Sequence, residues 1–187
     1  MNRILFFVMG VTLLSCSAKT VPSKSASGHD AGTVTVLTYN IHHANPPSKP
    51  DLIDIDAIAG VIKKQNPDVV ALQEVDVHTR RSGINLNEAE EIARLTGMKA
   101  YFARAIDYDS GEYGVAILSK LPVRDFANTS LPTDDITKGE HRTLATAKVD
   151  LPNGKQFVFA CTHLDAQHTD VNRQLQIKKI LEVLQQE

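Results

Sequence analysis

The chain has 187 residues, a formal net charge of −2 and a hydrophobic fraction of 42%. This composition is ordinary for a soluble globular domain. It lacks the basic excess of proteins that bind duplex nucleic acid non-specifically, which disfavours that class without excluding it. Of the two cysteines, Cys16 lies in an N-terminal segment and Cys161 in an apolar run, so a disulfide framework is excluded. We expect Cys161 to be an inert core thiol.

The N-terminal segment has the features of a targeting signal. The basic residue Arg3 precedes an apolar stretch, Ile4–Leu14, which is too short to span a bilayer. The stretch runs into Leu13-Leu14-Ser15-Cys16, which resembles the signal of bacterial lipoproteins, where the peptide is cleaved before a cysteine that then carries lipid. This resemblance implies a lipid-anchored membrane lipoprotein of the bacterial cell envelope, facing the periplasm or the cell surface. An ordinary secretory signal ranks behind it, because no A-x-A-like cleavage site follows.

We therefore expect three parts along the chain. Residues 1–16 are the lipoprotein signal with the lipidated Cys16, residues 17–32 are a flexible tether, and residues 33–187 are one folded domain. The tether is rich in Ser, Ala and Gly and has too few large apolar residues to form a core. The folded part has the usual size of a single domain.

Four apolar runs in the folded part each carry polar residues at one end. A short, nearly continuous apolar run bounded by polar residues predicts a strand buried on both faces. The runs are TVTVLTYN ending at Asn40, DVVALQE ending at Glu74, GVAILS preceded by Glu112 and Tyr113, and KQFVFACTH ending at His163. Functional groups collect where such strands open onto a crevice, so these amide, carboxylate and imidazole groups predict a metal-assisted hydrolase.

Helical spacing of apolar residues predicts two helices among these strands. The first covers Asp54–Lys64 and ends near Asn66-Pro67, and the second covers Asn87–Leu95 with Gly97 as its C-cap. A strand, helix and strand across residues 33–74 then form a crossover unit.

The second half of the domain reads as successive strands followed by a helix. Asn153-Gly154 predicts a hairpin turn between the strands Arg142–Leu151 and Lys155–Thr162. Crossover and hairpin connections together predict an α/β sandwich with mixed sheets. The last helix, Asp170–Glu187, ends without a cap or a following strand, so we expect a truncated product or the front part of a longer domain. A terminal helix docked onto the sheet is the alternative.

Four short motifs occur in order along the folded part: Thr38-Tyr39-Asn40-Ile41, Leu72-Gln73-Glu74-Val75-Asp76, Gly111-Glu112-Tyr113-Gly114-Val115 and Thr162-His163-Leu164-Asp165. Together they resemble the endonuclease/exonuclease/phosphatase superfamily from about residue 33 to the end. The resemblance implies a four-layer α/β sandwich of deoxyribonuclease I-like type, with mixed β-sheets flanked by helices. It is partial, because the G-D-x-N and D-H motifs that members carry further on do not occur. It also implies phosphoester hydrolysis that depends on Mg²⁺ or Mn²⁺.

Phosphoester hydrolysis explains two of the polar residues. Metal ions and positive donors stabilise the charge that develops on the phosphate oxygens. By resemblance Glu74 is the metal carboxylate, and Mg²⁺ often binds through one or two carboxylates. Asn40 would orient Glu74 or the metal-bound water. The alternative for Glu74 is a surface carboxylate after a strand, which its four preceding apolar residues make less favoured.

The remaining predicted site residues would contact the phosphate or the leaving group. His163 follows a strand, and in deoxyribonuclease-like members a glutamate at the place of Glu112 pairs with this histidine. Such a pair fixes the imidazole tautomer and raises its pKa. Arg142 matches an arginine that faces the phosphate, which suits a planar guanidinium. A surface arginine is the alternative for Arg142, and Tyr113 either lends its hydroxyl to the crevice or packs.

Other polar residues beside the crevice are candidates for substrate choice. They are His42, His43, Asp76 and Arg80-Arg81-Ser82. The two adjacent histidines suggest a transition-metal site, but neighbouring residues on a strand face opposite ways, which argues against it. Asp165 is expected to shape the loop after His163, with structural roles for Arg173 and Gln176.

The sequence thus predicts a monomeric, lipid-anchored, metal-dependent phosphoesterase. Its substrate is a phospholipid, a sugar or inositol phosphate, or a nucleic acid. The base for the attacking water is expected from the Asp-His pair that the chain lacks, so a chain ending at Glu187 should be nearly inactive. One alternative is a secreted nuclease, whose binding would fall steeply with salt. The other is a non-catalytic surface-binding module that keeps the front of the fold.

Overall fold

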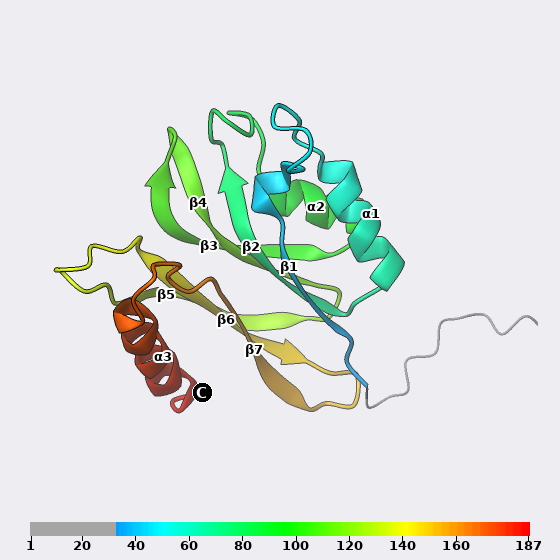
Figure 1. The fold of residues 1–187 in the computed structure, drawn as a ribbon. Coiled ribbons are helices and arrows are strands. Elements are labelled where there is room, and N and C mark those ends of the chain that lie inside the picture. Colours follow the sequence, from blue (N-terminus) through cyan, green and yellow to red (C-terminus); the bar gives the residue numbers. More distant parts are fainter. Residues whose placement is uncertain (1–32) are drawn as a thin grey trace, which may run out of the picture.

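The computed structural model describes residues 33–187, which form two β-sheets packed face to face. The larger sheet has the order β1-β2-β4-β3 and the smaller one the order β5-β6-β7 (Figure 1). Strand β1 runs parallel to β2, whereas every other pairing is antiparallel. The strands are β1 (Val36–Asn40), β2 (Val69–Val77), β3 (Lys99–Tyr108), β4 (Gly111–Ser119), β5 (Val123–Leu131), β6 (Arg142–Asp150) and β7 (Gln156–Thr162). The predicted crossover and the predicted hairpin are both confirmed.

Two helices cover the outer face of the larger sheet: α1 (Ile55–Gln65) and α2 (Glu88–Thr96) (Figure 1). Their ends agree with the sequence prediction. The Asp54 carboxylate accepts a hydrogen bond from a backbone N–H of α1, and the Asn87 side chain does the same for α2. Asn66 and Gly97 end the helices in the left-handed conformation, with φ of 49° and 70°.

Strand β2 shows how the core is divided, because its alternate side chains enter two different clusters. Val70 and Leu72 pack against α1 and α2, whereas Val69 and Ala71 pack against the smaller sheet. Strands β2 and β4 are buried on both faces where their apolar runs lie, as predicted. Strand β1 is not: it lies at the sheet edge, and Val36 is 53% exposed.

The third helix, α3 (Val171–Leu184), lies beside the smaller sheet and contacts β5 (Figure 1). The layers therefore run from α1 and α2 through the two sheets to α3, which is the predicted four-layer α/β sandwich. Within residues 33–187 no helix is long and apolar enough to cross a membrane. The predicted signal, the lipidation site Cys16 and the tether lie outside the described residues.

Candidate active site

Asn40 and Glu74 meet at one edge of the larger sheet because β1 and β2 are parallel neighbours. Asn40 is the last residue of β1 and pairs with Gln73, so it lies next to Glu74. The Asn40 Nδ2 donates a hydrogen bond of 2.7 Å to Glu74 Oε1, and the Asn40 Oδ1 accepts one of 3.0 Å from the His42 backbone N–H. Both ends of the amide are thus held, and the predicted orienting contact between Asn40 and Glu74 is present.

Glu74 occupies a β-bulge rather than the end of its strand. Strand β2 continues to Val77, and its register with β4 shifts between Gln73 and Val75. Glu74 has a φ of 58°, a left-handed conformation that is rare in a strand. A bulge re-aims one side chain without ending the strand, and such features collect at functional sites. The sequence located the carboxylate but not this local geometry.

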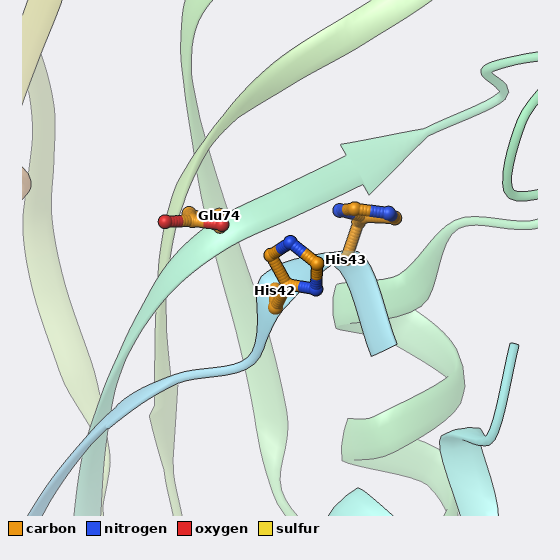
Figure 2. Close-up of side chains that lie close together, drawn as sticks. All are labelled: His42, His43 and Glu74. Atoms are coloured by element: carbon orange, nitrogen blue, oxygen red, sulfur yellow. The ribbon is translucent and has the colours of Figure 1, made fainter. Parts of the chain in front are cut away.

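His42 and His43 lie beside Glu74, so their direction differs from the sequence expectation. Strand β1 has already ended at Asn40, and His42–Ala44 forms a short turn instead. The turn places both rings on the same side, with ring centroids 4.5 Å apart. One ligand atom from each histidine and one Glu74 carboxylate oxygen lie within 4.8 Å of one another (Figure 2). These residues could hold a metal ion.

His163 directly follows β7, as predicted, and faces Glu74. Its Nδ1 is 4.0 Å from Glu74 Oε1, is buried, and has no hydrogen-bond partner among residues 33–187. Burial, and then the positive charge of Arg142, lower the pKa of the imidazole, against smaller opposing effects of Glu74 and Glu140. His163 is therefore neutral at pH 7, with one ring nitrogen to donate and one to accept.

Glu112 has a different partner from the one expected. It lies on β4, and its carboxylate forms an ion pair of 3.6 Å with Arg104 Nε. The acidic group beside His163 is Glu74, and the pKa of His163 is lowered. The predicted rise of that pKa is therefore wrong, because burial and a nearby arginine dominate the surroundings of the imidazole.

Arg142 and Tyr113 line one small pocket with His163. Arg142 is the first residue of β6, its side chain is 9% exposed, and its guanidinium lies 2.6 Å from Glu140 Oε1. The Arg142 Nε is buried without a partner among residues 33–187, so it is free to donate to a bound group. Burial, and then the charges of Glu74 and Glu140, raise the pKa of Tyr113 to about 12, which keeps its hydroxyl protonated.

A second, more polar pocket of about 210 Å³ adjoins the first and shares Arg142 with it. It lies between β3, β5 and β6, and its lining carries two guanidinium groups. The lining residues are Arg104, Ala105, Asn128, Ser130, Arg142 and Thr143. Amide, hydroxyl and guanidinium groups of this kind suit an anionic or polar extension of a substrate.

Asp76 and Arg81 form a structural unit at the rim of the site. The fully buried Asp76 carboxylate accepts two hydrogen bonds from Arg81, at 2.7 and 2.8 Å, and one each from Thr79 and Ser82. Burial acts to raise the pKa of Asp76, but these donors outweigh it and hold the pKa below its ordinary value. The Arg81 guanidinium lies 4.3 Å from the ring centroid of Tyr108. Asp76 therefore supports the rim and does not face a substrate.

The loop after His163 is held as the sequence predicted. The buried Asp165 donates its backbone N–H to Gln176 Oε1 at 2.9 Å, and its carboxylate accepts from Gln167 N at 2.8 Å. Arg173 donates to the Asp165 carbonyl. Cys161 is buried and free, and burial raises its pKa to about 12, in agreement with an inert core thiol.

The site thus joins a carboxylate at a bulge, converging imidazoles, a buried arginine and a protonated tyrosine. Anion binding and metal-assisted attack on a phosphorus centre are the reactions that this set of groups suits. The two sheets packed face to face with helices on the outside define the class of deoxyribonuclease I-like α/β sandwich proteins.

The sequence profile of the Endonuclease/Exonuclease/phosphatase family matches residues 37–182, so the chain belongs to this family. Solved structures with the same fold agree. The endonuclease/exonuclease/phosphatase from Beutenbergia cavernae DSM 12333 is 25% identical, with a TM-score of 0.70 over 80% of this chain and 43% of that chain. The human Nocturnin catalytic domain with bound sulfate anion is 22% identical, with a TM-score of 0.64 over 82% of this chain and 58% of that one.

A truncated Caenorhabditis elegans TDP2 is 24% identical, with a TM-score of 0.58, and the match covers 82% of this chain and 57% of that one. The chain therefore spans about half the length of these solved structures. A comparison with curated protein sequences gives no match.

Proposed function

We propose that the chain carries residues of a divalent-metal-dependent phosphoesterase site. The observation that supports this most directly is the convergence of Glu74, His163, Arg142 and Tyr113. The Glu74 carboxylate is 4.0 Å from His163, and Arg142 and Tyr113 line a pocket with that histidine. A metal carboxylate beside phosphate-binding donors is what hydrolysis of a phosphoester requires.

Glu74, oriented by Asn40, is the residue that would hold Mg²⁺ or Mn²⁺. The donor set fits such an ion. Asn40 donates a hydrogen bond to Glu74 Oε1, so the second carboxylate oxygen of Glu74 is available to bind the ion. When bound, the ion supplies Lewis-acid stabilisation of the phosphate oxygens.

The chain's own donors then bind and orient the ester. Arg142 donates to a non-bridging oxygen through its unpartnered Nε. Tyr113, protonated because of its high pKa, donates its hydroxyl. His163, whose pKa is lowered by burial and then by the charge of Arg142, donates one ring N–H to the phosphate or to the leaving oxygen. Its expected partner Glu112 does not support this role, because Glu112 pairs with Arg104.

The test is hydrolysis of a chromogenic phosphodiester and a chromogenic phosphomonoester in Mg²⁺ or Mn²⁺. The chain, its extension along the reading frame and Glu74→Gln in each are compared. We expect metal-dependent turnover that Glu74→Gln abolishes, and the preferred ester narrows the substrate class. Equal turnover with Glu74→Gln, or none in any form, would contradict the proposal and favour a binding module.

A nuclease is the second candidate, and the adjoining polar pocket favours it. Arg104 and Arg142 on its lining would bind successive phosphates of a single strand. A labelled single-stranded oligonucleotide tests this candidate. Nuclease function requires cleavage, and binding that weakens steeply as salt rises, because phosphate contacts release counterions.

We also propose that the protein is a lipoprotein of the bacterial cell envelope, anchored through Cys16 and acting as a monomer. The basis is the signal-like sequence that ends at Leu13-Leu14-Ser15-Cys16. Metabolic labelling with an alkyne fatty acid in a bacterial host tests the anchor. We expect label and membrane association with the natural chain, and neither with Cys16→Ser. Labelling of Cys16→Ser would contradict the proposal.

A further inference from the structure

We propose that His42, His43 and Glu74 together bind one divalent first-row transition-metal ion, such as Zn²⁺ or Fe²⁺, in preference to Mg²⁺. The inference rests on the proposed function in one respect, namely that Glu74 is a metal carboxylate. It adds two ligands and a metal preference that the phosphoesterase proposal does not contain.

The three side chains lie close enough to share one ion. Ligand atoms of the three residues lie within 4.8 Å of one another. Two donors on one ion are separated by at most about 4 Å, twice a metal–nitrogen bond of about 2.1 Å. Small side-chain rotations therefore bring all three onto a common ion. Figure 2 shows that the histidines come from the turn after β1 and that Glu74 comes from β2.

An unusual backbone conformation brings the two imidazoles together. His42, His43 and Ala44 have φ values of 48°, 41° and 52°, so three successive non-glycine residues are left-handed. L-amino acids seldom adopt this conformation in succession, and such backbone clusters at functional sites. Its effect is visible in the rings, which lie on one side of the turn with centroids 4.5 Å apart. An extended backbone would direct the two rings to opposite sides.

Hydrogen bonds hold the turn on both sides of the two histidines. The Ala44 N–H donates to the Ile41 carbonyl at 3.0 Å, and the Ala44 carbonyl accepts from Asp54 N at 2.8 Å. The buried Asn45 amide donates to the carbonyls of Lys49, Pro50 and Leu52 at 3.2, 3.0 and 2.7 Å. The ligands are thus pre-positioned, which lowers the entropic cost of binding.

A hydrogen bond of the His42 ring fixes which of its nitrogens is open to a ligand. Its Nδ1 lies 3.0 Å from the Asn45 carbonyl oxygen, which can only accept, so Nδ1 carries the proton. The Nε2 lone pair is therefore left for a ligand. A ring N–H bonded to a backbone carbonyl is the usual support of a metal-bound histidine.

The donor chemistry decides the kind of ion. Mg²⁺ prefers oxygen ligands and keeps several waters, and Mn²⁺ shares much of this preference, whereas imidazole suits Zn²⁺, Fe²⁺ and Ni²⁺. Glu74 alone would serve either class. Two imidazoles beside it favour a transition metal, as in other sites with two histidines and one carboxylate.

The test is metal binding by the full chain, measured by calorimetry with Mg²⁺, Mn²⁺ and Zn²⁺ after metal has been stripped. The variants are His42→Asn, His43→Asn and Glu74→Gln, because asparagine tolerates positive φ and removes the imidazole. His168→Asn is the matched control, since His168 is exposed in the loop before α3.

We expect each of the two histidine variants to weaken Zn²⁺ binding by at least about tenfold, and Mg²⁺ binding by less than about twofold. Glu74→Gln should weaken binding of all three ions, and His168→Asn should weaken binding of none. An unchanged Zn²⁺-to-Mg²⁺ affinity ratio in both histidine variants would overturn the inference. This experiment measures metal binding and not turnover. The metal site can therefore be confirmed even if no ester is hydrolysed, and it can be contradicted even if an ester is hydrolysed.

A second measurement needs no variant and covers the case in which a substitution unfolds the turn. Diethyl pyrocarbonate modifies free imidazoles, and peptide mass spectrometry locates the modification. Zn²⁺ should protect His42 and His43 but not His168, and Mg²⁺ at the same concentration should protect neither His42 nor His43. Equal modification of His42 and His43 with and without Zn²⁺ would overturn the inference.

Discussion

The amide of Asn40 donates a 2.7 Å hydrogen bond to Glu74 Oε1, across two strands that lie 34 residues apart in sequence. This contact joins the first two motifs of the chain into one site. Glu74 lies on a bulge with positive φ, so its direction is set partly by the backbone and partly by this amide.

Asn40→Ala should therefore lower metal affinity by about 10- to 100-fold, as loss of an outer-shell contact does. The free energy of unfolding should fall by no more than about 1 kcal/mol, because the hydrogen bond is exposed. Thr38→Ala is the matched control: Thr38 accepts a 3.2 Å hydrogen bond from Gln73 across the same two strands, away from Glu74. Calorimetric metal titration and urea unfolding measure both effects. Equal metal affinity of Asn40→Ala and Thr38→Ala would show that Asn40 does not orient Glu74 for metal binding.

Arg142→Gln should weaken binding of inorganic phosphate by about 10- to 100-fold, the loss of one charge-assisted contact. The phosphate affinity of Arg142→Lys should lie between that of the natural chain and that of Arg142→Gln, because an ammonium keeps the positive charge but lacks the planar fork. Arg124→Gln is the control, since Arg124 is exposed on β5 and pairs with Asp150 at 2.6 Å. Competitive inhibition of ester hydrolysis, or direct phosphate titration, measures the affinities. Phosphate binding that survives Arg142→Gln would place the anion elsewhere.

Most of the fold could be predicted because local signals agree with it. Asp54 and Asn87 cap helices, Gly97 ends one, and the apolar runs of β2 and β4 are buried on both faces. Strand β1 misled the prediction because an apolar run does not reveal whether its strand lies at a sheet edge, and Val36 is half exposed.

The site was predictable in its composition but not in its local geometry. Asn40, Glu74, His163 and Arg142 meet because strand ends and a bulge gather them, and the motifs carry that information. The left-handed turn at His42–Ala44 has no glycine to signal it, so the convergence of two histidines could not be read from the residues. The ion-pair partner of Glu112 is Arg104, which lies outside every motif, so the motifs could not reveal this pairing.

The pKa of His163 provides a test of which charges surround it. Arg142 lowers this pKa and Glu74 raises it, so Arg142→Gln should raise the pKa and Glu74→Gln should lower it. Glu112→Gln should leave it unchanged within error, because Glu112 pairs with Arg104. Nuclear magnetic resonance titration of the metal-free chain follows the ring directly. A fall in the His163 pKa on Glu112→Gln would show that Glu112 pairs with His163, as the motif suggested.

Glu88 makes the stability of the domain depend on pH. It is fully buried at the start of α2, its Oε2 accepts from Asp76 N at 2.8 Å, and Oε1 has no partner within residues 33–187. Burial raises its pKa from 4.5 to about 8. The folded state therefore binds this proton more tightly than the unfolded state does.

It follows that the contribution of Glu88 is most favourable below pH 4.5 and is lost as pH rises through about 8. Its contribution to the unfolding free energy should fall by up to about 1.4 kcal/mol per pH unit between these values. Glu88→Gln keeps an acceptor for Asp76 N and should flatten the profile, whereas Glu90→Gln, exposed on the same helix, should not. Urea unfolding from pH 5 to 8.5 measures the difference between the variants. Parallel profiles for Glu88→Gln and the natural chain would show that Glu88 is ionised in the folded state despite its burial.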